Sequence, residues 1–412
     1  MIILKIHSTV KLRTCIDKEI HMLINLPKDV IKIIDDLESK GHEAYIVGGC
    51  VRDSIMGVVP KDWDITTSAL PDQVVQIFPK TFASGIKHGT VTVVINQIGY
   101  EVTTYRIDGE YLDNRRPDNV VFTSDINKDL SRRDFTINAI AYNPKKGFVD
   151  PFFGKEDIEN KLIRCVGNPN HRFSEDALRM LRAIRFSGQL NFAIDNETIN
   201  VISALSRSIC NISAERIRDE LVKLIISTNV EAIKMLKTTG LLLYIIPSYI
   251  GDLDKVISLL KSCPFHECMR LAVFFEYSRD KCNHLLRHLR FDNKTIKEVH
   301  YYISMINTII SADRYEIKKY LRYVSLDIFT NLLTLQSLFY PDNASNQRSV
   351  YAIAHDIIQK EECFCLTDLS VKGVDLIAAG IPNGKPLGDK LEELLDMVMR
   401  KPELNDCLHK FL

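Results

Sequence analysis

The sequence lacks the features that would mark a protein for a membrane or for export. No uninterrupted apolar run reaches the roughly 18 residues that a transmembrane helix needs. The first 20 residues contain neither a long apolar core nor a small-residue cleavage site, so they do not resemble a signal peptide. We therefore expect a cytoplasmic protein without a membrane partner.

The sequence also has no excess of either charge and few cysteines. Lysine and arginine number 53, and aspartate and glutamate number 53, so the formal net charge is zero. This balance disfavours a protein that coats nucleic acid by bulk positive charge, but it allows a local basic groove. Ten cysteines in 412 residues are too dilute for a disulfide scaffold. The cysteines and histidines of residues 263–288 lack paired CxxC spacing, so we interpret them as ordinary core and surface residues.

The two parts of the chain differ in their hydrophobic patterns. Apolar residues at helical spacing predict helices over 28–40 and 71–78, the second begun by Pro71. A short apolar strand, AYIV, precedes two glycines, and the β-branched runs 88–97 and 100–107 predict a hairpin. After about residue 155 the β signals largely stop, and helical patterns follow one another to the end of the chain.

These patterns predict an α+β N-terminal head with a mixed sheet, followed by an all-α neck, body and tail. The predicted divisions are an N-terminal extension over 1–25, a head over 26–150, a helical neck over 151–225, a body over 226–310 and a tail over 311–412.

The first motif that suggests chemistry is GGCVRD, residues 48–53. The strand brings Gly48 and Gly49 into a turn where backbone N–H groups can approach phosphate oxygens, and Arg52 adds a cationic fork. The P-loop pattern GxxxxGK[ST] is absent. By itself the motif is equally typical of a tight strand-to-helix turn.

Asp62 and Asp64 follow this turn closely. On a strand, residues at i and i+2 point to one face, so the two carboxylates would converge. Paired carboxylates beside a phosphate-binding turn suit Mg²⁺-assisted phosphoryl transfer, although a solvent-facing pair at a strand end is the simpler alternative. Glu101, on the predicted hairpin, is a candidate third carboxylate.

Two further motifs are rich in arginine. Arg132 and Arg133 precede Asp134 and an apolar run that reads as a helix, so they could reach phosphates or simply pair with Asp134. In the second motif, Ser174 is the expected N-cap of a helix with Glu175 and Asp176 in its first turn. Asp176, Arg179, Arg182 and Arg185 then form a slowly winding stripe that offers base-edge hydrogen bonds and phosphate charge.

Together these motifs identify a family resemblance. GGCVRD with DWD, RRDFTINAIAYN, VDPFFGKEDI and EDALRMLRAIRF resemble, in order, the class II tRNA nucleotidyltransferases (the bacterial and eukaryotic CCA-adding type) of the polymerase-β-like superfamily. The resemblance covers residues 45–225 and extends more loosely into the tail. It implies that Asp62 and Asp64 bind Mg²⁺, that Gly49, Arg52 and Arg133 hold the nucleotide, that Asp176 and Arg179 read the base, and that Arg182 and Arg185 support base or phosphate.

The resemblance implies addition of CCA to the 3′ end of tRNA from CTP and ATP, with release of pyrophosphate. An acceptor-only carboxylate beside a donor-only guanidinium can accept cytosine and adenine and reject uracil and guanine, which suggests that Asp176 and Arg179 act as a protein template. The expected partners are the acceptor and T arms of tRNA, CTP and ATP, and the chain would act as a monomer or a homodimer.

Other activities stay open within and beyond this family. Family members that add only C have a shortened loop, whereas residues 106–126 here read as full length, which favours CCA addition or A-only addition. The signature of the poly(A) polymerase branch is absent, and the single His355–Asp356 pair predicts no phosphohydrolase activity. A catalytically idle RNA-binding protein and a small-molecule nucleotidyltransferase are the remaining alternatives.

Overall fold

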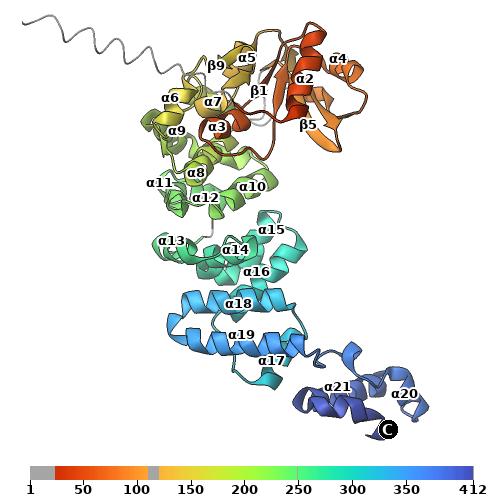
Figure 1. Ribbon diagram of the computed structural model, residues 1–412. Coiled ribbons are helices and arrows are strands. Elements are labelled where there is room, and N and C mark those ends of the chain that lie inside the picture. The colour runs from red at the N-terminus through yellow and green to blue at the C-terminus, as the bar shows by residue number, and fades with distance from the viewer. Residues whose placement is uncertain (1–23, 110–119, 248, 412) are drawn as a thin grey trace, which may run out of the picture. The chain divides into compact units, whose positions relative to one another are not determined.

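The computed structural model describes residues 24–109, 120–247 and 249–411. The chain forms two compact units that divide between residues 247 and 248. Among the described residues, every strand belongs to the first unit, and the second unit contains only helices and turns (Figure 1). The predicted order of an α+β head and a helical continuation is therefore confirmed.

A seven-stranded mixed sheet with the order β3-β4-β5-β2-β1-β8-β9 forms the centre of the first unit. All neighbouring strands are antiparallel except β2 and β5, which run parallel. Its strands are β1 (Ala44–Val47), β2 (Ile65–Thr67), β3 (Thr81–Gly85), β4 (Thr90–Ile95), β5 (Ile98–Thr104), β8 (Ala141–Asn143) and β9 (Gly147–Val149). Two small two-stranded sheets pair β6 (Arg106–Asp108) with β7 (Val120–Phe122) and β10 (Leu162–Ile163) with β11 (Ala193–Ile194).

The helices of the first unit are α2 (Lys28–Ser39), α3 (Gly49–Ile55), α4 (Pro71–Ile77), α5 (Ile126–Ser131), α6 (Gly154–Glu159), α7 (Pro169–Glu175), α8 (Leu178–Leu190), α9 (Asn196–Leu205), α10 (Ala214–Ile225), α11 (Lys234–Thr238) and α12 (Leu241–Ile245). Helix α2 buries Val30, Ile33, Ile34 and Leu37, which is the apolar spacing seen in the sequence. Helix α8 packs against α10, and this pair carries the arginine-rich stripe.

The predicted hairpin is confirmed as β4 and β5. Its turn consists of Asn96 and Gln97, which both adopt the left-handed conformation (φ 49° and 66°). A two-residue turn with positive φ at both positions matches the right-handed twist of the two strands.

The expectation of a helix after Asp134 is wrong. Residues Thr136–Asn138 form a single 3-10 turn, and Ala141–Asn143 form strand β8 between β1 and β9. A short apolar run does not distinguish a buried strand from a buried helix, because both are apolar on every side. In the structure this buried run pairs with β1 on one side and with β9 on the other, and it is therefore a strand.

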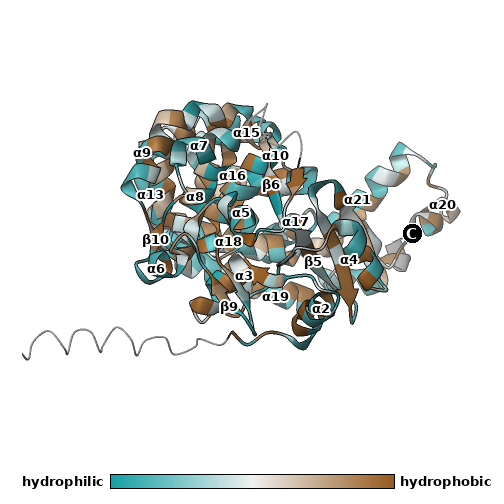
Figure 2. Cartoon of the chain, turned by 90° about the horizontal axis from the view of Figure 1, so that it is seen from above, coloured by the Kyte–Doolittle hydropathy of each residue, from teal (hydrophilic) through white to brown (hydrophobic). Residues whose placement is uncertain are grey.

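The second unit contains α13 (Leu253–Ser262), α14 (Glu267–Phe275), α15 (Cys282–His288), α16 (Asn293–Met305), α17 (Arg314–Leu321), α18 (Leu326–Phe339), α19 (Ala344–Gln359), α20 (Gly373–Ala378) and α21 (Lys385–Arg400). Helices of both units alternate apolar and polar residues along their length (Figure 2). Helix α14 is buried from Met269 to Phe275, as expected for a core helix. No helix among the described residues is long and apolar enough to cross a membrane.

Candidate active site

Asp62 and Asp64 do not lie on a strand, so the pleat argument for their common face is wrong. Strand β2 begins only at Ile65. The two carboxylates nevertheless line one cavity of about 580 Å³, which we call the carboxylate cavity. Asp64 is held in extended conformation because its carbonyl accepts a hydrogen bond from the Val47 N–H of β1. The loop before β2 brings Asp62 to the same cavity.

Glu101 also lines the carboxylate cavity. Strand β5 runs parallel to β2 with Ile65 opposite Val102, so Glu101 stands beside Asp64 in the register. Three acidic residues therefore face one space. Loss of hydration at the cavity wall raises the pKa of Asp64, the negative charges of Glu101 and Asp62 raise it further, and Arg133 opposes them.

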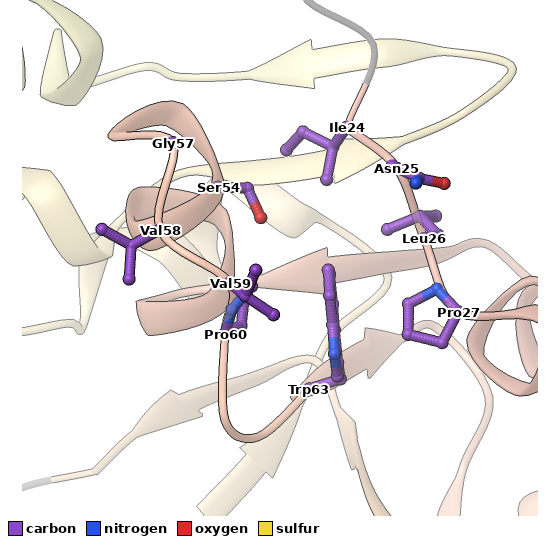
Figure 3. A pocket seen from close by; sticks show the side chains of 10 residues that line it. All are labelled: Ile24, Asn25, Leu26, Pro27, Ser54, Gly57, Val58, Val59, Pro60 and Trp63. Carbon is purple, nitrogen blue, oxygen red and sulfur yellow. The ribbon is translucent and has the colours of Figure 1, made fainter.

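Trp63, between the two aspartates, borders a second and mostly apolar pocket of about 410 Å³. Figure 3 shows its ring between Pro27 and Pro60, with Val59 close by. Trp63 also lines the carboxylate cavity, so this side chain is part of the wall on which the two aspartates stand.

A third space, a cavity of about 430 Å³, also has Asp64 in its lining. We call it the arginine cavity because six arginines line it: Arg52, Arg132, Arg133, Arg179, Arg182 and Arg216. Gly48, Gly49, Asp134, Asn138, Asp176 and Phe186 complete its lining with Asp64. Several guanidinium groups that are fixed in direction beside a carboxylate cluster are suited to hold a polyphosphate through oriented hydrogen bonds.

The glycine turn permits a close approach by Arg133. Gly48 has φ 80°, which side chains rarely adopt, and a Cβ placed there would lie 3.1 Å from the Arg133 Nη1 atom. The Arg133 Nε atom is buried and has no hydrogen-bond partner among the described residues. Arg52 enters the cavity from α3, where its guanidinium donates to Asp53 and to the Asn138 side-chain oxygen at 2.6 Å.

Arg132 and Arg133 pair with Asp129 and not with Asp134, which corrects the simpler alternative from the sequence. The Asp129 carboxylate is fully buried and accepts from Arg132 at 2.8 Å and Arg133 at 3.2 Å. Burial alone would raise the pKa of Asp129, but the two arginines outweigh it and lower the pKa. Asp129 therefore stays charged and holds both guanidinium groups at the cavity wall.

Asp134 instead binds the distant Arg182 of α8. Two nitrogens of Arg182 donate to one carboxylate oxygen of Asp134 at 2.9 and 2.7 Å. Burial opposes ionisation, yet Arg182 and a hydrogen bond from Asn138 lower the pKa of Asp134 to about 2.

Ser174 and Glu175 are not the start of a helix, as the sequence suggested, but the end of α7. Asp176 then breaks the helix with φ −142° and ψ 102°, and its side chain accepts from the Leu178 N–H at the beginning of α8. Helix α7 ends inside this motif. The residue whose side chain caps the following helix is therefore Asp176 and not Ser174, two positions earlier. Arg216 of α10 grips the same carboxylate through two hydrogen bonds, of 3.2 and 2.7 Å.

The other arginines of the stripe separate in the structure. Arg179 lines the arginine cavity and donates to Glu175 and to the carbonyl of Arg132. Arg185 is not among the residues that line this cavity, and it donates to Glu220 of α10 at 2.7 Å. Most of the site residues predicted from the sequence line one of the two cavities: Gly49, Arg52, Asp62, Asp64, Arg133, Asp176, Arg179 and Arg182. Glu101, the candidate third carboxylate, lines the carboxylate cavity as well.

The sequence reasoning missed Arg216, which lines the arginine cavity, and Asp129, which holds two of the arginines of that cavity. Arg216 sits in AERIRDELVKLI, where an arginine on the polar side of an amphipathic helix reads as a solvated residue. No local signal distinguishes it from Arg218 two positions later. The middle of the predicted full-length loop, residues 110–119, lies outside the described residues.

Three protein-family models match successive parts of the chain. Residues 44–164 match the model of the poly A polymerase head domain, 191–251 that of an RNA and SrmB binding site of polymerase A, and 268–406 that of tRNA nucleotidyltransferase domain 2. A CCA-adding enzyme of a Geobacillus species is 37% identical over 89% of this chain and 90% of its own length. That of Ligilactobacillus salivarius is 34% identical over 93% and 95%.

A solved structure is similar over the same extent. The crystal structure of the Bacillus stearothermophilus CCA-adding enzyme in complex with CTP has a TM-score of 0.79 to this chain at 32% identity, covering 90% of this chain and 92% of that one. Both units of the present fold therefore have counterparts in these proteins.

Proposed function

The chain belongs to the CCA-adding enzymes, the tRNA nucleotidyltransferases that complete the 3′ end of tRNA with CTP and ATP, and from this premise we propose which side chains perform each part of the reaction. The 3′ hydroxyl oxygen of tRNA forms a bond to the α-phosphorus of the nucleotide. The bond from that phosphorus to the bridging oxygen breaks, and pyrophosphate leaves. Relatives across the full length carry the CCA-adding name, so neither A-only addition nor poly(A) synthesis is favoured.

The arginine cavity receives the nucleotide triphosphate. The buried Arg133 Nε without a protein partner is the observation that carries this assignment, because a buried donor left unpaired costs about 1–3 kcal/mol. Phosphate oxygens would satisfy it. Arg52 is aimed at the same space by Asp53 and Asn138, and Gly48 and Gly49 leave room for a ligand to approach the backbone.

Asp62 and Asp64 are the ligands for divalent metal, and we assign Mg²⁺. Among the described residues no three acidic, histidine or cysteine side chains form a complete metal cage. This fits Mg²⁺, which is usually held by one or two carboxylates with substrate phosphates and water. Burial and then the negative charges of Glu101 and Asp62 raise the pKa of Asp64, and a bound cation would favour its charged form. Bound metal would supply charge stabilisation at the reacting phosphate.

The position of Asp64 also assigns the tRNA end. In-line displacement requires the attacking oxygen and the leaving pyrophosphate on opposite sides of the α-phosphate. Asp64 lines both cavities, so a triphosphate in the arginine cavity leaves the carboxylate cavity for the terminal ribose of tRNA. Asp62 and Glu101 line that same cavity, so their carboxylates can accept the proton that leaves the 3′ hydroxyl of tRNA.

Asp176 reads the base with one remaining acceptor site. A carboxylate has about four lone-pair positions. Three are used, by the Leu178 N–H and by two nitrogens of Arg216. One is left for the amino group that cytosine and adenine share. Arg179 stands in the same cavity as the donor half of the pair.

Arg182 and Arg185 support the pair Asp176 and Arg179, which reads the base. Glu220 accepts from Arg185 at 2.7 Å and lies 3.6 Å from Arg182, which Asp134 holds on its other side. Arg182 lines the cavity, so it can contact base or phosphate, while Arg185 fixes Glu220. We retain the finer division into head, neck, body and tail as part of this proposal, with the body and tail binding the acceptor and T arms.

The direct test uses three transcripts of one tRNA, ending at the discriminator base, at C and at CC, with CTP alone, ATP alone or both. Extension of all three to CCA supports the assignment, and Asp64→Asn is the matched variant that should bind nucleotide without transferring it. Extension of only the CC-ended transcript with ATP would make the chain an A-adding enzyme, and long adenosine tails would make it a poly(A) polymerase. No extension by the wild type would revive the binding-protein alternative.

A further inference from the structure

The second unit contains a pocket that the reaction described above does not use. It has a volume of about 390 Å³ and lies between α16, the turn after α17 and the start of α18. Its lining residues are Asn293, Lys294, Lys297, Glu298, Tyr301, Tyr323, Val324 and Ile328. The volume is within the range of small-molecule sites, which start near 300 Å³.

Three kinds of side chain meet in this pocket. Tyr323 is 78% exposed, so its ring offers an accessible aromatic face. Lys294 and Lys297 are exposed on the same side of α16, and neither makes an ion pair with another described residue. Val324 and Ile328 supply a half-buried apolar surface between them.

Tyr301 adds a polar group that lacks a partner. Its hydroxyl oxygen is buried and has no hydrogen-bond partner in the part of the chain that the structure describes. Burial raises the pKa of this hydroxyl to about 12, so it is a neutral donor at neutral pH. The only acid of the pocket, Glu298, already accepts from the Tyr302 hydroxyl at 2.8 Å.

We propose that this pocket binds one unstacked nucleotide of the tRNA, with the base on Tyr323 and its phosphate at Lys294 and Lys297. A nucleobase needs an aromatic face, an apolar floor and an in-plane hydrogen bond, and its phosphate needs cations. All four are present here, with the Tyr301 hydroxyl as the donor. The match of residues 268–406 to a tRNA nucleotidyltransferase domain favours RNA as the occupant, and the inference rests on tRNA being the substrate of the proposed function.

None of the residues proposed for the reaction lines this pocket, so its loss should change KM for tRNA and leave kcat and KM for CTP unchanged. Stacking of one base on an aromatic residue corresponds to about a five- to 100-fold effect on affinity. We expect Tyr323→Ala to raise KM for tRNA within that range. Tyr301→Phe removes only the hydroxyl and should raise it less. Tyr351→Ala, at another exposed tyrosine of the same unit, is the control and should leave it unchanged.

Salt dependence tests the two lysines. Each phosphate contact contributes about 0.7–0.9 to the slope of log affinity against log salt. Because both lysines meet the single phosphate of one nucleotide, the double change of Lys294 and Lys297 to Gln should reduce that slope by about 0.7–0.9. A tRNA transcript carrying 4-thiouridine at unpaired positions should crosslink to the peptide that contains Tyr323.

The outcomes separate this inference from the proposed function. Wild-type KM and wild-type salt slope in all three pocket variants, with an active wild-type enzyme, would overturn the pocket assignment alone. Saturable binding of free AMP or CMP in the pocket with no effect of the variants on tRNA would also overturn it, because the occupant would then be a small ligand. Failure of every variant and of the wild type to extend tRNA would count against the proposed function instead.

Discussion

The most specific prediction concerns the hydrogen-bonded ion pair of Arg216 and Asp176. Two hydrogen bonds join the pair, and their side chains are 31% and 14% exposed. Replacing Arg216 by Ala frees the Asp176 carboxylate to turn away from the base. The enzyme then loses the fixed acceptor that faces the carbonyl oxygen of uracil or guanine, and with it part of the reason those bases are rejected.

The magnitude follows from the geometry. Hydrogen bonds to charged groups contribute about 1.5–3 kcal/mol. Partial exposure screens this pair, so we take the lower end, about 1.5 kcal/mol. Since about 1.4 kcal/mol is a factor of ten, Arg216→Ala should raise incorporation of UTP and GTP relative to CTP and ATP by about tenfold. The assay compares kcat/KM for each of the four nucleotides on a CC-ended and a C-ended transcript.

Arg218→Ala is the matched control because Arg218 lies on the same helix, pairs with the exposed Asp219 beside it and is not among the residues that line the arginine cavity. It should leave discrimination unchanged. If Arg216→Ala discriminates among the four nucleotides as well as Arg218→Ala does, Asp176 does not depend on this grip and the template argument fails. Thermal unfolding of both variants separates loss of selectivity from loss of fold.

Three further predictions concern the metal, the acid limit and a strained residue. Removal of divalent cations with EDTA should stop nucleotide addition by the wild type, and Mg²⁺ should restore it but should not restore Asp64→Asn. Asp134 has a pKa of about 2 in the fold. Because the unfolded value is near 3.9, its pairing with Arg182 contributes about 2 kcal/mol that is present above pH 4 and lost towards pH 2. Urea unfolding of Asp134→Asn should lack that part of the acid dependence. Phe153 has φ 60° and is 64% exposed. Phe153→Gly should therefore stabilise the protein by about 1 kcal/mol, and Phe153→Ala, which keeps the strained backbone, should not.

Much of the fold was predictable because it rests on local pattern. Helix α2 and the β4–β5 hairpin follow directly from apolar spacing of 3.6 and 2 residues. Strand β8 was not predictable, since its run is buried on both faces and gives no period. Its identity depends on β1, almost a hundred residues away, which offers a free edge.

The site was predictable in its residues but not in its pairing. Charge and spacing located Asp176 and Arg179, yet they did not reveal that Asp176 ends one helix and caps another. The Arg216–Asp176 and Arg182–Asp134 pairs join positions 40 and 48 residues apart. Such contacts are set by the packing of α8 on α10 and on the sheet, which one sequence does not display.

The charges that line the arginine cavity give the proposed divalent metal a second role besides stabilising charge at the reacting phosphate. That role is to balance the charge of the bound triphosphate. Six arginines line it, but five acids already pair with them: Asp53, Asp129, Asp134, Glu175 and Asp176. Asp64 contributes a further negative charge to the wall. The cavity is therefore close to neutral, although it consists of guanidinium groups that are fixed in direction by their partners. A triphosphate entering it gains oriented hydrogen bonds but little net positive charge. On the proposed assignment, divalent cations at Asp62 and Asp64 would balance the negative charge of the triphosphate that the cavity itself leaves unbalanced.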